Sequence, residues 1–164
     1  MKIGIISDTH DRLLRTRFAV QLLKSQGAEL LVHCGDFIGR EILVACSALP
    51  LYFVFGNNDC DTVPDLQQVA TELGATCLGW GGEFTVQEKR LAVVHGHLMS
   101  DLRPLLKSQP DYLFSGHSHI RGDWLEGTTR RINPGALHRA EEFTVALLEL
   151  STSAVQFLPI PKQV

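Results

Sequence analysis

The sequence predicts an α/β fold in which two mixed β-sheets carry helices on their outer faces. Up to about Thr76, short apolar runs alternate with stretches of helical periodicity, which is typical of parallel βαβ units. Beyond that point, paired apolar runs are separated by short polar segments, which indicates hairpins. Five of the apolar runs end in a short cluster of Gly, Asp, Asn, His, Ser or Thr, so each cluster is expected where a strand leaves the core.

The first part of the chain is expected to contain three strands and three helices. Leu14, Phe18 and Leu22 recur at helical spacing and predict the first helix, which Gly27 ends. The expected strands are residues 2–7, 30–33 and 51–55, and the second and third helices are expected at residues 41–48 and 65–73.

The second part is expected to form hairpins and one further helix. In chain order, we expect strands 84–86 and 91–94 joined by a four-residue turn, a helix at 99–107, a strand at 112–115, and short strands at 124–125 and 131–132. A last hairpin of residues 143–150 and 155–158 is expected to complete the second sheet.

Composition limits what the protein can be. With 164 residues, 45% apolar and 20% charged, the chain is expected to form one domain over residues 1–164. The net charge is −3 and there is no basic stripe, which argues against extended nucleic-acid binding but leaves small charged substrates open. No apolar run approaches the roughly 20 residues of a membrane-spanning helix.

The four cysteines contain no C-x-x-C pair. The first apolar run begins at the N-terminus and leads directly into the first polar cluster, so we expect no signal peptide. We therefore expect free thiols and a cytoplasmic location. Cys34 stands beside a polar cluster, but a small buried residue is its simpler interpretation.

The five polar clusters bring metal-ligating side chains to strand ends. They are Asp8-Thr9-His10, Gly35-Asp36, Gly56-Asn57-Asn58-Asp59, His95-Gly96-His97 and Gly116-His117-Ser118-His119. If the pairs spaced two apart continue a strand, as in Asp8 and His10, their side chains point the same way. Asp36 can bridge two ions through its two carboxylate oxygens. The candidate ligands are Asp8, His10, Asp36, Asn57, His95, His117 and His119. Seven groups with one shared carboxylate supply four ligands to each of two ions.

Each cluster alone has a simpler interpretation as a turn, because Gly, Asp and Asn are common turn residues. The occurrence of all five in one chain of this size, each after a predicted strand, favours a shared site. Five of the seven histidines lie in the clusters, and His33 and His138 lie outside them. His33 is interpreted as a hydrogen-bonded strand residue.

The order D-x-H, G-D, G-N-x-D, H-G-H and G-H-S-H resembles the calcineurin-like metallophosphoesterase superfamily, and within it the small phosphodiesterases of the YfcE type. The resemblance runs from Asp8 to the turn of Asn133, Pro134 and Gly135. It implies a four-layer α/β/β/α sandwich and a metal-dependent phosphoric ester hydrolase.

The resemblance also implies how the ligands divide. One ion takes Asp8, His10, Asp36 and His119, and the other takes Asp36, Asn57, His95 and His117. Two divalent ions, Mn²⁺ first and Ni²⁺, Zn²⁺, Fe²⁺ or Co²⁺ as alternatives, then activate a bridging hydroxide that attacks the phosphorus. Imidazole and oxygen ligands without thiolates suit all of these metals.

Two further residues are candidate catalytic residues. His97 has the same expected direction as His95 and is a candidate for contacting the phosphate. Asn58 stands where many relatives carry a histidine that protonates the leaving group, and an amide is no general acid at ordinary pH. This departure indicates substrates with good leaving groups. Asp11 and Asp59 are either carboxylates that orient a ligand or solvated turn acids.

Two other interpretations stay open. A eukaryotic retromer scaffold subunit shares the implied fold and acts through protein contacts, but its relatives typically lose the first histidine, which this chain keeps as His10. A dinuclear hydrolase of non-phosphate bonds fits the same ligands. The expected partner is a small-molecule phosphate ester, and a homodimer is possible.

Overall fold

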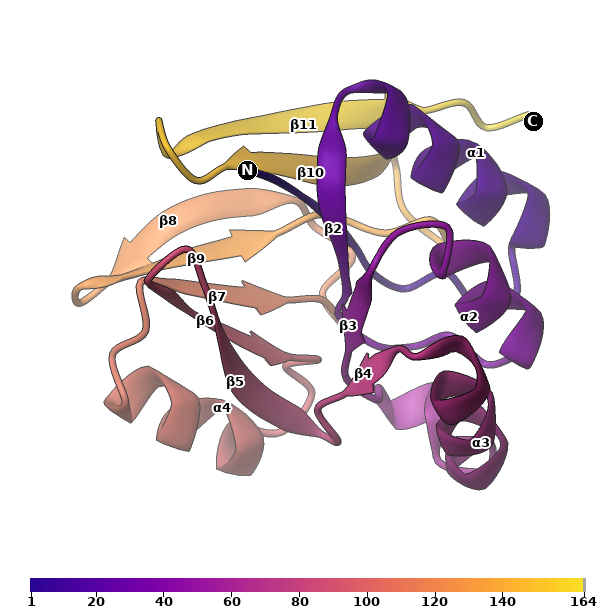
Figure 1. The fold of residues 1–164 in the computed structure, drawn as a ribbon, viewed down its shortest axis with the longest axis horizontal. Helices are drawn as coiled ribbons and strands as arrows, with labels where there is room; N and C mark the ends of the chain where they lie inside the picture. Colours follow the sequence, from indigo (N-terminus) through magenta and orange to yellow (C-terminus); the bar gives the residue numbers. More distant parts are fainter. Residues whose placement is uncertain (164) are drawn as a thin grey trace.

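The computed structural model describes residues 1–163 and contains two β-sheets packed face to face (Figure 1). The first sheet has the strand order β11-β10-β1-β2-β3-β4. Strands β1 to β4 are parallel, β10 pairs with β1 in the antiparallel direction, and β11 pairs with β10 in the antiparallel direction. Its strands are Lys2–Ile6 (β1), Ala28–His33 (β2), Leu51–Phe53 (β3), Thr76–Cys77 (β4), Phe143–Glu149 (β10) and Ala154–Ile160 (β11).

The second sheet has five strands in the order β5-β6-β7-β9-β8. The central strands β6, β7 and β9 are parallel, and hairpins add β5 and β8 at the two edges. Its strands are Gly81–Val86 (β5), Lys89–Val94 (β6), Tyr112–Ser115 (β7), Gly122–Glu126 (β8) and Thr129–Asn133 (β9).

The helices form the two outer layers. Helices α1 (Leu13–Ser25), α2 (Arg40–Cys46) and α3 (Val63–Leu73) cover the first sheet, and α4 (Met99–Lys107) covers the second (Figure 1). Successive side chains of a strand point to opposite faces. Leu30 and Val32 therefore join the core between the sheets, whereas Leu31 packs under the helices. The predicted fold class, two mixed sheets with helices outside, is confirmed, and so are the four layers.

The last hairpin was assigned to the wrong sheet. Strand β10 pairs with β1 in an antiparallel ladder, with Ile3 opposite Leu148, so the hairpin extends the first sheet. Five consecutive residues of β10 are buried, because core lies on both of its faces. The continuous apolar run of β10 gave no information about which sheet it joins.

Two local expectations also need correction. The turn between β5 and β6 has two residues, Gln87 and Glu88, both with positive φ, because Val86 already pairs with Lys89. In α1, two residues of the expected apolar repeat face solvent, Leu14 at 65% and Phe18 at 39% exposed, and Leu22 packs partly buried against the core. The buried face of α1 is instead formed by Thr16, Ala19, Val20 and Leu23.

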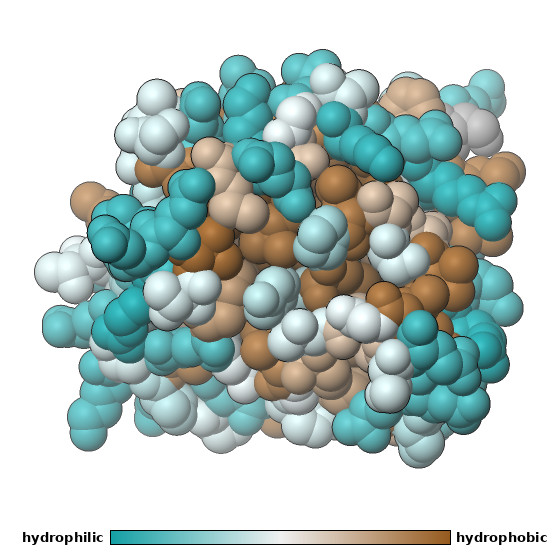
Figure 2. Space-filling view, viewed as in Figure 1, coloured by the Kyte–Doolittle hydropathy of each residue, from teal (hydrophilic) through white to brown (hydrophobic). Residues whose placement is uncertain are grey.

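Apolar residues gather across the middle of the face seen in Figure 2, with hydrophilic residues around them. All four cysteines are unpaired, as expected, and Cys34 is buried. Within residues 1–163 there is no helix of the length and apolarity needed to cross a membrane.

Candidate metal centre

The five polar clusters form loops at the ends of β1, β2, β3, β6 and β7, and these loops meet at one edge of the two sheets. Asp8, His10, Asp36, His117 and His119 all have positive φ, which Asp and His tolerate better than most residues. Asp8 and His10 therefore do not continue β1 in an extended conformation, and the argument from strand alternation was wrong. Asp8 and His10 are instead placed next to the Asp36 loop by backbone hydrogen bonds between the two loops.

Two glycines allow the loops to approach each other. A Cβ atom at Gly56 would collide with the Asp36 carboxylate, and one at Gly116 would collide with Ser7. Glycine at both positions is required because the backbone lies directly against these polar side chains.

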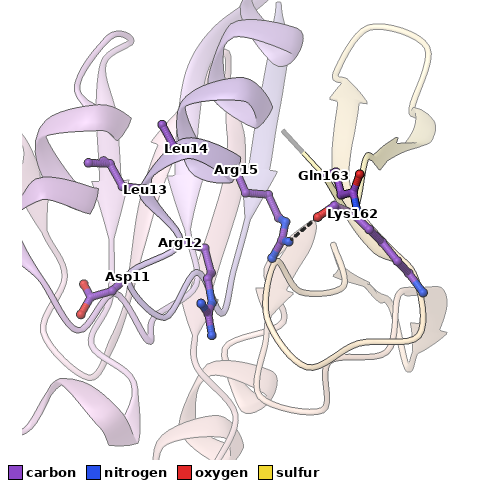
Figure 3. Close-up of a pocket in the computed structure, with 7 residues that line it drawn as sticks. All are labelled: Asp11, Arg12, Leu13, Leu14, Arg15, Lys162 and Gln163. Carbon is purple, nitrogen blue, oxygen red and sulfur yellow. Dashed lines mark hydrogen bonds between the residues drawn. The ribbon is translucent and has the colours of Figure 1, made fainter.

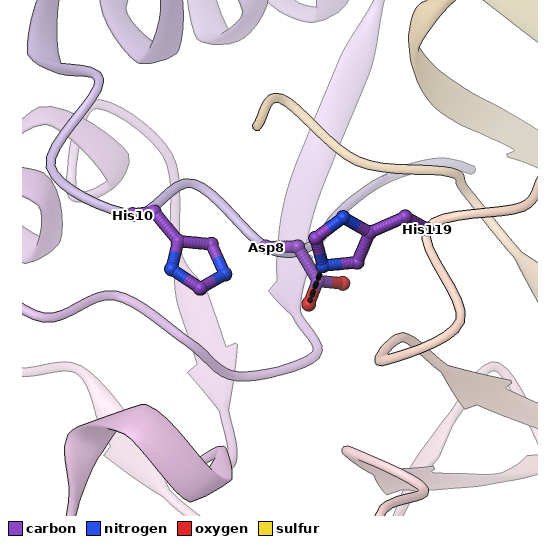
Figure 4. A group of neighbouring side chains, drawn as sticks. All are labelled: Asp8, His10 and His119. Carbon is purple, nitrogen blue, oxygen red and sulfur yellow. Dashed lines mark ion pairs between the residues drawn. The ribbon is translucent and has the colours of Figure 1, made fainter. Parts of the chain in front are cut away.

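The first group of facing ligand atoms comes from Asp8, His10 and His119 (Figure 4). His119 Nε2 lies 3.1 Å from Asp8 Oδ1. The other oxygen, Asp8 Oδ2, accepts hydrogen bonds from Ser7 Oγ (2.6 Å) and from the backbone N–H of His117 (3.1 Å). Asp8 is thus held through Oδ2, and Oδ1 is left facing the imidazoles.

The second group comes from Asp8, Asp36 and His95. Asp36 Oδ2 lies 3.4 Å from His95 Nε2 and 3.3 Å from His10 Nε2. Asn57 Oδ1 lies 3.2 Å from His95 Nε2. The structure therefore brings six of the seven candidate ligand side chains within short distance of one another.

The seventh candidate, His117, lies at the edge of this group. Its side chain is exposed, and its ring centroid is 5.2 Å from that of His95. His97 lies beyond His95, with ring centroids 5.4 Å apart. Burial and the neighbouring His95 lower the pKa of His97, and its Nδ1 is buried without a hydrogen-bond partner in the described part of the chain.

The donor atoms of this group fit a cation. His95 Nδ1 donates to the Cys34 carbonyl oxygen at 2.7 Å, which leaves the lone pair of Nε2 facing the oxygens of Asp36 and Asn57. Within residues 1–163, Asp8 Oδ1 and His10 Nε2 are buried without hydrogen-bond partners. Acceptor atoms facing one another in a buried space are stable only when a cation or protons lie between them.

The pKa shifts of Asp8, Asp36 and His119 follow from the same close approach of carboxylates and imidazoles. Burial opposes ionisation of Asp36, but the adjacent imidazoles of His10 and His95 outweigh it, so the pKa of Asp36 is lowered. The pKa of Asp8 is lowered in the same way, with burial outweighed by His119, His95 and Ser7. The Asp8 carboxylate raises the pKa of His119. Carboxylates held in the charged form are suited to bind a metal ion.

Asn58 and Asp59 organise the Asp36 loop. Asn58 donates to both Asp36 oxygens, from its side-chain Nδ2 (2.7 Å) and its backbone N–H (2.9 Å). Asp59 is fully buried and accepts hydrogen bonds from the backbone N–H groups of Asp36, Ile38 and Gly56. Asp59 therefore orients backbone and no imidazole. Its position three residues after Gly56, at the one-turn 3₁₀ helix Asn57–Asp59, is a capping pattern that sequence reasoning did not use.

Other residues near the site are now placed. His33 is a buried hydrogen-bonded residue, as expected: its Nδ1 accepts from the Gly35 N–H, and its Nε2 lies 3.1 Å from Thr9 Oγ1. Asp11 is exposed. His138 and Arg139, which sequence reasoning left without a role, line the same cavity as the candidate ligands. This cavity of about 430 Å³ is lined by His10, Asp36, Ile38, Asn57, Asn58, His117, His119, His138 and Arg139.

A four-layer fold with carboxylates and imidazoles at converging strand ends defines a metallohydrolase type of protein. Residues 1–153 match the family model of the calcineurin-like phosphoesterase superfamily domain, and the chain belongs to this superfamily. The protein is accordingly a phosphoric ester hydrolase, and the predicted family is confirmed.

Individual relatives agree with this assignment. Phosphodiesterase MJ0936 of Methanocaldococcus jannaschii is 30% identical over 82% of this chain and 83% of its own length. Phosphodiesterase YfcE of Escherichia coli is 23% identical over 84% of this chain and 79% of its own length.

Solved structures share the fold. A structure described as a novel archaeal phosphodiesterase has a TM-score of 0.87 at 26% identity and covers 97% of this chain and 99% of its own. A Vps29 mutant from Entamoeba histolytica has a TM-score of 0.66 at 16% identity, covering 98% of this chain and all of its own. The second likeness concerns the fold alone.

Proposed function

We propose that this protein is a phosphodiesterase that uses two divalent metal ions, with Mn²⁺ the first candidate and Ni²⁺, Zn²⁺, Fe²⁺ or Co²⁺ as alternatives. The observation that carries the proposal is the convergence of buried, unpartnered ligand atoms from Asp8 and His10 beside the charged Asp36. Buried polar atoms without partners are rare in proteins and require a physical explanation. Divalent cations between these atoms provide one.

The positions of the side chains support a division into two sets. Asp8, His10, Asp36 and His119 would hold one ion, and Asp36, Asn57, His95 and His117 the other. Asp36 Oδ2 lies within 3.4 Å of one imidazole from each set, His10 and His95, which supports Asp36 as the shared ligand. Asp8 faces imidazoles of both sets as well, at 3.1 Å from His119 and 4.0 Å from His95.

Metal ions held here would activate water for attack on phosphorus and stabilise charge on the phosphoryl oxygens. The residues of the chain prepare the site for them. Asn58 holds Asp36 in place through two hydrogen bonds, so its role in this proposal is to position that carboxylate and not to donate a proton. Backbone carbonyls accept from Nδ1 of His95 and His119, which directs Nε2 of both rings into the site.

His97 is the proposed phosphate-contacting residue. Its lowered pKa keeps the imidazole neutral at pH 7, and a neutral imidazole carries one N–H donor. Because neither His97 nor Asn58 supplies a strong acid, the proposal is restricted to diesters with good leaving groups.

The names of the relatives support the diester specificity, since two relatives of similar length are phosphodiesterases. The proposal includes one catalytic domain over residues 1–164, a small-molecule phosphate ester as substrate, a cytoplasmic location and a possible homodimer. The shared fold with Vps29 gives the alternative of an interaction scaffold some basis, but His10 and the complete ligand set favour catalysis.

The test is hydrolysis of bis(p-nitrophenyl) phosphate by the metal-free full chain, before and after addition of each metal. We expect nitrophenolate release only with metal, highest with Mn²⁺, and faster than from p-nitrophenyl phosphate. Metal bound per chain, measured by calorimetry, should approach two. If the chain binds metal but hydrolyses neither ester with Mn²⁺, Ni²⁺, Co²⁺ and Zn²⁺ alike, the result would favour the alternative of an interaction scaffold.

A further inference from the structure

The cavity that holds the candidate ligands has a positively charged wall that the proposed function does not use. His138 and Arg139 line this wall and Arg12 is hydrogen-bonded to His138; we call these three residues the cationic rim. His138 and Arg139 line the cavity together with His10 and His119. The His138 ring lies against the His10 ring, with centroids 4.5 Å apart. The rim is therefore adjacent to the candidate metal ligands.

The rim is held in place by hydrogen bonds. Arg12 Nε donates to His138 Nδ1 at 3.2 Å, so the proton of the neutral imidazole is on Nε2. The backbone carbonyl of Arg139 accepts from His119 Nδ1 at 3.3 Å. Arg15 Nη1 donates to the carbonyl of Leu137, next to His138, at 2.6 Å. These hydrogen bonds fix the side chains of Arg12 and His138 and the backbone at Leu137 and Arg139, and groups positioned in this way are suited to recognise a ligand.

Within the described residues, no carboxylate forms an ion pair with the rim. Within residues 1–163, Arg12 and Arg139 have no Asp or Glu oxygen within 4.0 Å, although Asp11 and Glu141 are near in sequence. Five other arginines are paired, as in Arg130 with Asp123 at 2.7 Å, whereas Arg15, Arg17 and Arg103 also have no such partner within residues 1–163. In a chain of net charge −3, two unpaired guanidinium groups beside the site create a local attraction for anions.

The positive region continues away from the metal ligands. Arg12 lines a neighbouring cavity of about 520 Å³, together with Asp11, Arg15 and Lys162 (Figure 3). The guanidinium of Arg15 is already engaged, since Nη2 donates to the Lys162 carbonyl at 2.9 Å. Arg12 thus links His138 of the first cavity to the second cavity, where Arg15 and Lys162 add positive charge and Asp11 adds one carboxylate.

We infer that the cationic rim binds a second phosphate of the substrate, so that the preferred substrates are phosphodiesters with a phosphate monoester on one ester arm. A guanidinium presents a planar set of donors that matches phosphate oxygens, and charge-assisted hydrogen bonds are stronger than neutral ones. This inference rests on the proposed phosphodiesterase function and adds the substrate class.

The test compares two substrates that differ only in the remote phosphate. These are the p-nitrophenyl ester of thymidine 5′-monophosphate and the same ester with a 3′-phosphate. In both, water forms a bond to the 5′-phosphorus, the bond to nitrophenolate breaks, and one proton is released. With the Mn²⁺-loaded full chain, kcat/KM should be about 10-fold higher for the 3′-phosphorylated ester, mainly through KM.

Substitutions locate the effect. Arg139→Gln and Arg12→Gln should each reduce the ratio of the two kcat/KM values to about two or less. Arg17→Gln is the matched control, because Arg17 is an exposed arginine of the same helix as Arg15 and lines neither cavity. It should keep the 10-fold ratio.

Equilibrium binding supplies a readout that needs no turnover. Calorimetry should show that thymidine 3′,5′-bisphosphate binds about 10-fold more tightly than thymidine 5′-monophosphate, and that Arg139→Gln removes the difference. A wild-type ratio near one in both measurements, or full retention of the ratio in Arg139→Gln, overturns the inference. Failure to hydrolyse either ester contradicts the proposed function, whereas the binding ratio still tests the rim.

Discussion

The two sheets contribute different chemistry to the candidate metal centre. The loops of the first sheet supply both carboxylates, Asp8 and Asp36, which are at most 2% exposed. The loops of the second sheet supply only imidazoles: His95 is buried, His117 is exposed and His119 lies between. The negative charge of the site thus comes from one sheet and most of its nitrogen ligands from the other.

The two halves of the site, the ligands from the first sheet and those from the second, are also held in place differently. The carboxylates accept hydrogen bonds, Asp8 from Ser7 and from the backbone N–H of His117, and Asp36 from Asn58. The imidazoles His95 and His119 are oriented by carbonyls of distant segments, at Cys34 and Arg139. The comparison indicates that the carboxylates are held by hydrogen-bond donors and the imidazoles by backbone carbonyl acceptors, with His95 reaching across to the loop after β2.

Removal of the shared charge in the first half should have the largest effect. Asp36→Asn keeps the shape of the side chain but removes a charge that faces His10 and His95. We expect hydrolysis of bis(p-nitrophenyl) phosphate to fall by about 10³-fold, because the charge that organises the site is lost. Asp61→Asn, at an exposed acid outside the site, is the control. A tenth of wild-type turnover with metal bound would show that Asp36 is not shared.

Loss of the loop support in the first half should reduce stability. Asp59→Ala removes the acceptor of three backbone N–H groups, those of Asp36, Ile38 and Gly56. Because buried donors without partners are costly, we expect the free energy of unfolding in urea to fall by about 3 kcal/mol. Asp61→Ala should change it by less than about 0.5 kcal/mol. Equal effects of the two substitutions would contradict the proposed role of Asp59.

The smallest effect is expected in the second half. His97→Ala should lower kcat/KM by about 10-fold, the usual contribution of one hydrogen bond to a charged group. Metal content should stay near two per chain, since His97 is not among the proposed ligands. His97→Asn, which retains an N–H donor, should recover part of the activity. A loss of bound metal in His97→Ala would instead show that His97 is a further metal ligand from the second sheet.

Much of the site was predictable from residue types and their order. The five clusters follow five strands, and parallel strands bring their carboxyl ends to one edge, so Asp36 and His95 were expected near each other without knowledge of the loops. The interpretations of Cys34 as a small buried residue and of His33 as a hydrogen-bonded strand residue are also confirmed.

Other features were not predictable because they depend on contacts between distant segments. The continuous apolar run of β10 fits either sheet, and only its pairing with β1 assigns it. The repeat of Leu14 and Phe18 looks like a buried face, yet α1 packs through Ala19 and Leu23. The left-handed conformations of Asp8 and His10 likewise follow from hydrogen bonds to the Asp36 loop and not from β1.

Sequence alone predicted the family, the two mixed sheets and the set of candidate ligands, because strand periodicity and the chemistry of Asp, Asn and His are local properties. Only the folded chain showed that Asn58 and Asp59 hold Asp36 and its loop, and that Arg12, His138 and Arg139 stand beside the same cavity. Arg12 and His138 are 126 positions apart, and no local pattern predicts a hydrogen bond between them. Their contact exists because the loop after β1 and the loop after β9 meet at the same edge of the packed sheets.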